Sequence, residues 1–169
     1  EADVRFIRGR LNLGFEPIES SKLIFDGRGV SPWDFKPCGY QKFFSVDIEL
    51  DNTHNFESPL FFDSQIEQHE DFRFLQWFPL SEKKLFVKDV RYSREAFMDD
   101  AEIREQLLNE IHKKYSNCFK VVREESATLP LPMTHQMFHH LEKNFPFSVG
   151  IRGGWFHPVI GYSLPYNLK

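Results

Sequence analysis

The adjacent residues Lys88 and Asp89 are the first candidates for chemistry, because both lie in a segment rich in apolar residues. A carboxylic acid on an apolar face has a raised pKa and can act as a general acid. Successive residues of a strand point to opposite faces, so Asp89 falls in phase with Leu85 and Val87, whereas Lys88 falls in phase with Phe86. We therefore expect the two charges on opposite faces of a sheet. A solvated or ion-paired Asp89 is the alternative.

Two glycine loops are candidates for holding an electron-rich ligand. Glycine lets backbone N–H groups approach a phosphate or a ring closely, and a proline suits the first turn of a helix. Ordinary turns are the alternative for both loops. The first loop contains Asp26, Gly27, Arg28 and Gly29, and the second contains Gly154, His157, Pro158, Gly161 and Tyr162. No complete Gly-x-Gly-x-x-Gly fingerprint of a dinucleotide site is present.

Hydrophobic periodicity predicts the sheet that must position these groups. Phe44, Val46, Ile48 and Leu50 alternate with polar residues, which indicates a strand with one buried face. Three further segments rich in aromatic and β-branched residues follow, and four consecutive strands favour an antiparallel sheet. These segments are 59–66, 72–80 and 84–92.

A helix is expected over residues 100–115, capped by Asp99 or Asp100 and packed on one face of the sheet. Its apolar residues recur every four positions at Ile103, Leu107, Ile111 and Tyr115. A further strand over 118–124 is expected to end before the prolines of 129–132, and a short helix is expected near 137–145.

Composition excludes several classes of function. The 21 Lys and Arg against 25 Asp and Glu give a net charge of −4, so nucleic acid is not an expected partner. No apolar run is long enough to cross a bilayer as a helix. His135 and His139 have the spacing of metal ligands but lack the accompanying glutamate, so no metal site is predicted. The 19 phenylalanines indicate an aromatic core or a pocket for a large apolar ligand.

Read together, several segments resemble bacterial lycopene β-cyclases, which are FAD-dependent carotenoid enzymes. The matching stretches include LIFDGRG at 23–29, SPLFFD at 58–63, REE at 123–125, and FHP with GYSLP at 156–165, in the family's order. The resemblance covers most of the chain and implies the central portion of such an enzyme. It implies an α/β (α+β) fold: an FAD/NAD(P)-binding flavoprotein-like fold with an antiparallel β-sheet substrate domain, incomplete at both ends.

The resemblance also implies a domain organisation. Residues 1–30 are expected to form part of the nucleotide-binding domain, 31–146 the substrate domain, and 147–169 the return to the nucleotide-binding domain. The cofactor implied is reduced FAD, with NAD(P)H as a candidate reductant and with a missing upstream segment needed for full binding. The expected partner is a linear carotenoid or another isoprenoid, and the expected location is the cytoplasm, peripheral to the membrane.

The family's reaction is a proton-initiated cyclisation of a carotenoid end group to a β-ring, without net redox change. The resemblance assigns catalytic roles to Lys88, Asp89 and Asp63, substrate contacts to Arg73, Phe74 and Trp77, and cofactor contacts to the two glycine loops. The sequence departs from the family where Lys88 replaces a carboxylate, since an ammonium is a far poorer proton donor. A flavin-dependent isoprenoid reductase and a non-catalytic apolar-ligand-binding module are the alternatives.

Overall fold

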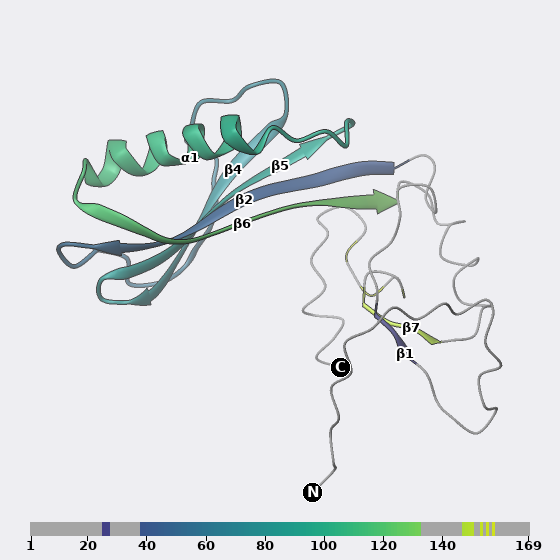
Figure 1. Cartoon of the computed structure of the whole chain (residues 1–169), viewed down its shortest axis with the longest axis horizontal. Coiled ribbons are helices and arrows are strands. Elements are labelled where there is room, and N and C mark those ends of the chain that lie inside the picture. Colours follow the sequence, from purple (N-terminus) through teal and green to yellow (C-terminus); the bar gives the residue numbers. More distant parts are fainter. Residues whose placement is uncertain are drawn as a thin grey trace, which may run out of the picture.

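The computed structural model describes residues 25–27, 38–132, 147–150, 153, 155 and 157. These residues form a five-stranded sheet, a two-stranded sheet and one helix (Figure 1). The elements are β1 (Phe25–Asp26), β2 (Cys38–Leu50), β3 (Leu60–Asp63), β4 (Phe72–Ser81), β5 (Lys84–Ser93), α1 (Asp100–Tyr115), β6 (Phe119–Pro132) and β7 (Phe147–Ser148).

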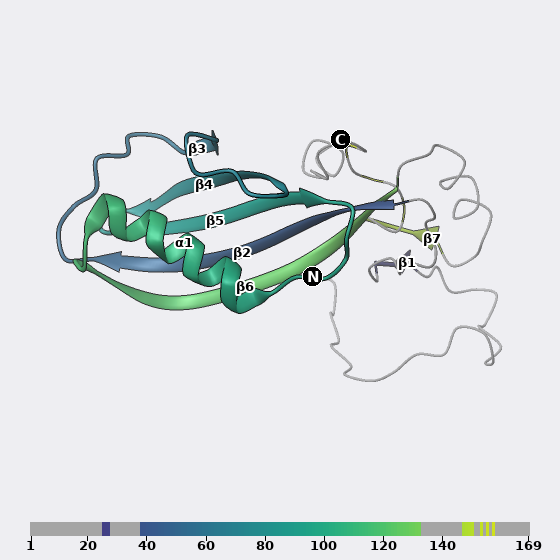
Figure 2. The ribbon, with the colours of Figure 1, turned by 90° about the horizontal axis from the view of Figure 1, so that it is seen from above.

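The large sheet is antiparallel throughout, which confirms the sheet that the sequence predicts. Its strand order is β3-β4-β5-β2-β6, so β2 lies between β5 and the edge strand β6 (Figure 2). The described part of the chain is thus mostly antiparallel sheet with one helix. The flavin-binding fold itself stays a prediction.

Strand register divides the side chains between two faces. Directly paired residues point to the same face of an antiparallel sheet. Val46 pairs with Val87, and Trp77 pairs with Val87 from the other side, so these three share a face. That face packs against α1 and forms the core, and we call it the helix face. Its buried apolar residues are Phe44, Val46, Ile48, Leu50, Leu75, Trp77, Leu85 and Val87.

Helix α1 forms where the periodicity predicts it and lies across the helix face (Figures 1 and 2). Its N-cap is Asp99, whose carboxylate accepts hydrogen bonds from the N–H groups of Ala101 and Glu102 at 3.0 and 3.1 Å. These two bonds satisfy donors that a helix start leaves unpaired. Ile103, Leu107 and Ile111 are the buried residues of α1. No helix of the described ranges has the length and hydropathy that crossing a bilayer requires.

The expectation that the prolines of 129–132 end a strand is wrong. Strand β6 continues through Pro130 to Pro132, and its Leu129 and Leu131 pair with Gln41 and Gly39 of β2. In the described sheet β6 has a neighbour on one side only. Proline lacks an N–H group, so an edge strand tolerates it when that position needs no ladder bond.

Strands β1 and β7 pair in parallel, with Phe25 opposite Phe147 and Asp26 opposite Ser148. The segment between them enters the large sheet at Cys38 of β2 and leaves it at Pro132 of β6, and these two residues are paired neighbours. Residues 38–132 therefore have the topology of an insertion between two paired strands. The domain boundaries at 30 and 146, the strand expected at the amino terminus and the helix near 137–145 lie outside the described residues.

Replacing Leu107 tests the packing of α1. The Leu107 side chain is 0% exposed, so we expect Leu107→Ala to lower the free energy of unfolding by about 2 to 5 kcal/mol through the cavity it leaves. Chemical denaturation measures this loss. Glu105→Ala, at an exposed position of the same helix, is the control and should leave stability nearly unchanged. Equal effects of the two variants would contradict the packing described for α1.

Candidate functional site

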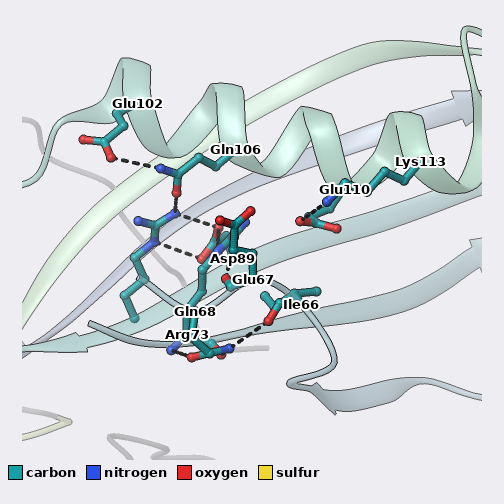
Figure 3. A network of polar contacts seen from close by, with 10 residues as sticks. Ile66, Glu67, Gln68, Arg73, Asp89, Glu102, Gln106, Glu110 and Lys113 are labelled. Carbon is teal, nitrogen blue, oxygen red and sulfur yellow. Dashed lines mark hydrogen bonds and ion pairs between the residues drawn. The ribbon is translucent and has the colours of Figure 1, made fainter. Parts of the chain in front are cut away.

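A buried ion-pair cluster occupies the helix face (Figure 3). The carboxylate of Asp89 is 0% exposed and accepts a hydrogen bond from Arg73 Nε at 2.8 Å. Arg91 donates to the same carboxylate from Nη2 at 3.0 Å and from Nε at 3.2 Å. Arg91 also reaches α1, where its Nη2 donates to Gln106 Oε1 at 2.6 Å. The cluster therefore joins β4, β5 and α1.

Arg73 is held from a second side by the loop before β4. Its Nη1 donates to the carbonyl of Glu67 at 3.3 Å, and Gln68 exchanges two hydrogen bonds with its backbone at 2.8 and 3.0 Å. The Nη2 atom of Arg73 is buried and has no hydrogen-bond partner among the described residues. Two guanidinium groups share one carboxylate, so the cluster has a formal net positive charge.

The expected division of Lys88 and Asp89 between opposite faces is confirmed. Asp89 pairs with Phe44 and Leu75 on the helix face, whereas Lys88 pairs with Ser45 and therefore faces the other way. Asp89 is bonded to two arginines under a helix, so its side chain does not reach a ligand on the far face. The geometry therefore favours a structural role for Asp89 over the catalytic role that the resemblance implies.

Asp63 and Trp77 also lie together, at the β3 edge of the sheet. Trp77 is 2% exposed, and its Nε1 donates to Asp63 Oδ2 at 3.1 Å. Its ring stacks on Phe56, with centroids 5.6 Å apart. Arg73 and Trp77 thus belong to the helix face, whereas Phe74 faces the opposite side. The structure does not bring the three expected substrate contacts onto one surface.

A cavity of about 420 Å³ opens beside the ion-pair cluster, between α1 and the loop before β4. Polar and charged side chains line it, so it does not suit a large apolar ligand. Its lining residues include Glu67, His69, Arg73, Gln106, Glu110 and Lys113.

The face opposite α1 carries a dense group of aromatic rings, and we call it the aromatic face. Phe74 contacts Phe62 with ring centroids 4.9 Å apart and Tyr92 at 6.2 Å, and Phe78 contacts Phe86 at 5.9 Å. The aromatic residues on it are Phe43, Phe61, Phe62, Phe72, Phe74, Phe78, Phe86 and Tyr92. These rings supply apolar area without a polar group, except at the hydroxyl of Tyr92.

A polar row crosses the aromatic face between its rows of aromatic rings. Gln76 pairs with Lys88, Lys88 pairs with Ser45, and Ser45 pairs with Glu125, so four strands each place one residue in the row. The neighbouring row contains Phe74 and, through Val90, Phe43. Lys88 is therefore a charged group set among aromatic rings.

The Lys88 ammonium contacts a ring and is influenced by the charge of a nearby carboxylate. Its Nζ lies 3.7 Å from the centre of the Phe43 ring, a cation–π contact. Burial lowers the pKa of the Lys88 ammonium below its ordinary value, and the negative charge of Glu125 partly offsets this shift. The Glu125 side chain is 54% exposed and accepts from Arg123 Nη2 at 2.7 Å. The row thus runs from a half-buried amine to a solvated carboxylate.

Part of the expected cofactor site lies where β1 and β7 end. Val149 N–H donates to the carbonyl of Asp26 at 2.9 Å, so the two strand ends adjoin. A Cβ added at Gly27 would lie 3.4 Å from the Val149 side chain, and Gly150 has a φ of +63°, which suits glycine. His157 is half-buried. The other expected contacts, Arg28, Gly29, Gly154, Pro158, Gly161 and Tyr162, lie outside the described residues.

Phe43, Gln76 and Glu125 were missed as site residues by sequence reasoning. Each belongs to a different strand, and only the register aligns it with Lys88. The signal available in the sequence was the two-residue period of each strand, which gives the face of a residue within its own strand. That period leaves the alignment between strands open.

The comparisons with known proteins agree on one family. Residues 14–169 match the family model described as Lycopene cyclase protein. A lycopene beta-cyclase from a Paracoccus species is 34% identical over 145 residues, which is 85% of this chain and 37% of that protein. Those from Pseudescherichia vulneris and Pantoea ananas are 33% and 28% identical over 84% and 86% of this chain. The chain spans just over a third of these relatives' length. No solved structure gave a significant match.

Removing the charge of Asp89 tests its structural role. Asp89→Asn leaves two buried guanidinium groups without an anion, so we expect it to lower the free energy of unfolding by about 3 to 5 kcal/mol. Glu124→Gln is the matched control, because it breaks the solvent-exposed pair with Arg104 and should cost only about 0 to 1 kcal/mol. Denaturation curves of both variants measure the difference. A stable Asp89→Asn protein would overturn the role assigned to the cluster.

Proposed function

The chain belongs to the lycopene cyclase family, and on that premise we propose that the protein is a lycopene cyclase-like flavoprotein acting on a linear carotenoid. The proposed reaction is the proton-initiated, non-redox cyclisation of an end group to a β-ring. One observation carries the proposal: the aromatic face opposite α1 holds a half-buried amine, Lys88, among its rings. The activity, substrate and partners of the whole protein are part of the proposal.

The aromatic face suits a long hydrocarbon. Phe74 is 1% exposed at its centre, while Phe61, Phe62 and Phe72 remain 50%, 57% and 58% exposed at the β3 and β4 edge. Covering the three exposed rings with an apolar chain removes both surfaces from water, which favours binding. Aromatic rings also attract a cation through their electron-rich faces, so the face supports a carbocation formed upon it.

The proton in this proposal comes from Lys88. The ammonium gives its proton to the terminal double bond of the end group, and a C–H bond forms as the N–H bond breaks. The cation is then captured by an internal double bond, and the neutral amine takes the proton that the ring loses. Donor and acceptor are thus the same nitrogen, and no net proton or electron is consumed. Burial of the amine helps, because it lowers the pKa of the Lys88 ammonium and makes it a stronger acid.

The paired ends of β1 and β7 are proposed to contribute to a flavin site. Glycines at both ends and a half-buried His157 fit a ligand that approaches backbone closely. Reduced FAD, with NAD(P)H as a candidate reductant, would supply negative charge that stabilises the cation. Asp26 and Gly27 would hold it, together with the expected contacts of the two glycine loops.

The substrate's solubility extends the proposal to the membrane. A linear carotenoid resides in the bilayer, so we propose that the protein works at the cytoplasmic side as a peripheral protein. The exposed rings of Phe61, Phe62 and Phe72 would lie toward the lipid.

An assay of Lys88 variants tests the proposed reaction. The full protein that carries this chain is incubated anaerobically with lycopene and reduced FAD, and products are identified by chromatography and mass. Lys88→Met should lose turnover because the proton donor is gone, and Lys88→Glu should raise it because a carboxylic acid is a stronger donor. Lys84→Met is the control. Absence of a β-ring product from both wild type and Lys88→Glu would refute the cyclase. A product heavier by two hydrogens would instead indicate the reductase.

The pH dependence of turnover should follow the pKa of Lys88, which Glu125 influences. The protonated amine is the donor, so turnover should fall as pH rises through the pKa of Lys88, which burial has lowered. Glu125 raises that pKa, so Glu125→Gln should move the fall to lower pH. Glu124→Gln, one residue away and on the other face, should leave the profile unchanged. An unshifted profile in Glu125→Gln would show that Lys88 is not the titrating donor.

A further inference from the structure

An amine among aromatic rings can do more than transfer protons. Lys88 and Lys84 lie on the same strand and the same face, yet Lys84 is exposed whereas Lys88 is half-buried with its Nζ over Phe43. A neutral amine is a nucleophile toward carbonyl carbon, and a desolvated lysine is neutral more often than a solvated one. The two lysines have the same side chain, but the half-buried Lys88 is expected to be the better nucleophile.

We propose that Lys88 is a covalent binding site for conjugated isoprenoid aldehydes, which it captures as an imine on the aromatic face. The proposal rests on the proposed function in one respect, since it takes the aromatic face to be the surface on which an isoprenoid chain lies. It goes further because it gives the site a second class of ligand. Such aldehydes are the products of oxidative cleavage of carotenoids.

The surroundings of Lys88 fit the linkage. The half-buried ring of Phe43 lies in the row next to it, where the polyene chain of the aldehyde would pack. Phe43 also attracts the positive charge of a protonated imine, as it does that of the ammonium. Burial lowers the pKa of the Lys88 ammonium, which supplies the neutral amine.

A counter-ion stands within the same row. Glu125 lies across Ser45 from Lys88 and interacts with its charge. The other charged groups on this face of the strands beside Lys88 are Asp47 and Glu49 of β2, Lys120 and Arg123 of β6, and Lys84 of β5 itself. Arg123 pairs with Glu125 at 2.7 Å. A negative charge at Glu125 favours the charged form of the imine, as it favours the ammonium of Lys88.

The covalent step balances without a further reagent. The lone pair of the Lys88 amine attacks the aldehyde carbon, and a carbinolamine forms. The C–O bond then breaks, the oxygen leaves as water, and a C=N bond replaces the C=O bond. No atom is oxidised or reduced. A proton on the imine nitrogen keeps the positive charge where the ammonium held it.

Trapping with borohydride tests the site in the full protein. All-trans-retinal is the probe, and borohydride reduces any imine to a stable secondary amine that peptide mass spectrometry locates. We expect a red-shifted absorption band before reduction and the adduct on Lys88 after it. Lys88→Arg keeps the positive charge and should lose both signals. Lys84→Arg is the matched control and should keep both. All-trans-retinol, which has no carbonyl, should give no adduct.

The outcomes separate this proposal from the proposed function. An adduct spread equally over Lys84 and Lys88, or retained in Lys88→Arg, would overturn the covalent site. A protein that forms β-rings but no Lys88 adduct would keep the cyclase and lose the covalent site. Excess lycopene should suppress the adduct if both ligands use the aromatic face. An adduct on Lys88 that lycopene does not suppress would support the covalent site and count against the cyclase.

Discussion

The fold depends on one buried carboxylate. Asp89 has no exposure to solvent and is held by Arg73 and Arg91, with Gln106 of α1 attached to the second arginine. A buried charge is tolerated only when it is paired, so this contact dictates which face of β5 lies under the helix. Since neighbours on a strand alternate, the same contact also turns Lys88 to the far face. The facing of Asp89 under the helix therefore also fixes the facing of Lys88, the candidate reactive group.

The two faces of the sheet then have different physical characters. The helix face is an apolar core crossed by an ion-pair cluster, and its remaining cavity is polar. The aromatic face is rich in rings, and a polar row from Gln76 to Glu125 crosses it. A positive charge in this row, where the family resemblance implies a carboxylate, reverses the local field. Glu125 restores a negative charge two strands away, so the row retains both an acid and a base.

The small parallel pair links this sheet to the rest of the chain. Because β1 and β7 adjoin in parallel, the loops that follow both strands begin at the same edge. Residues 38–132 form an insertion between these two strands, and its two ends are paired neighbours. This topology explains how segments more than a hundred residues apart could serve one cofactor, as the proposed function requires.

Local pattern in the sequence determined the elements and the face of each residue within its own strand. The alternation around Phe44, the four-residue period of α1 and the opposite facing of Lys88 and Asp89 all follow from geometry that neighbours in the chain impose. Tertiary structure alone decided that β2 lies between β5 and β6, that the prolines of β6 fall on an edge, and that Glu125 stands opposite Ser45. Those facts depend on which strands pair and in what register, and pairing is chosen by packing across the whole sheet rather than by any local period.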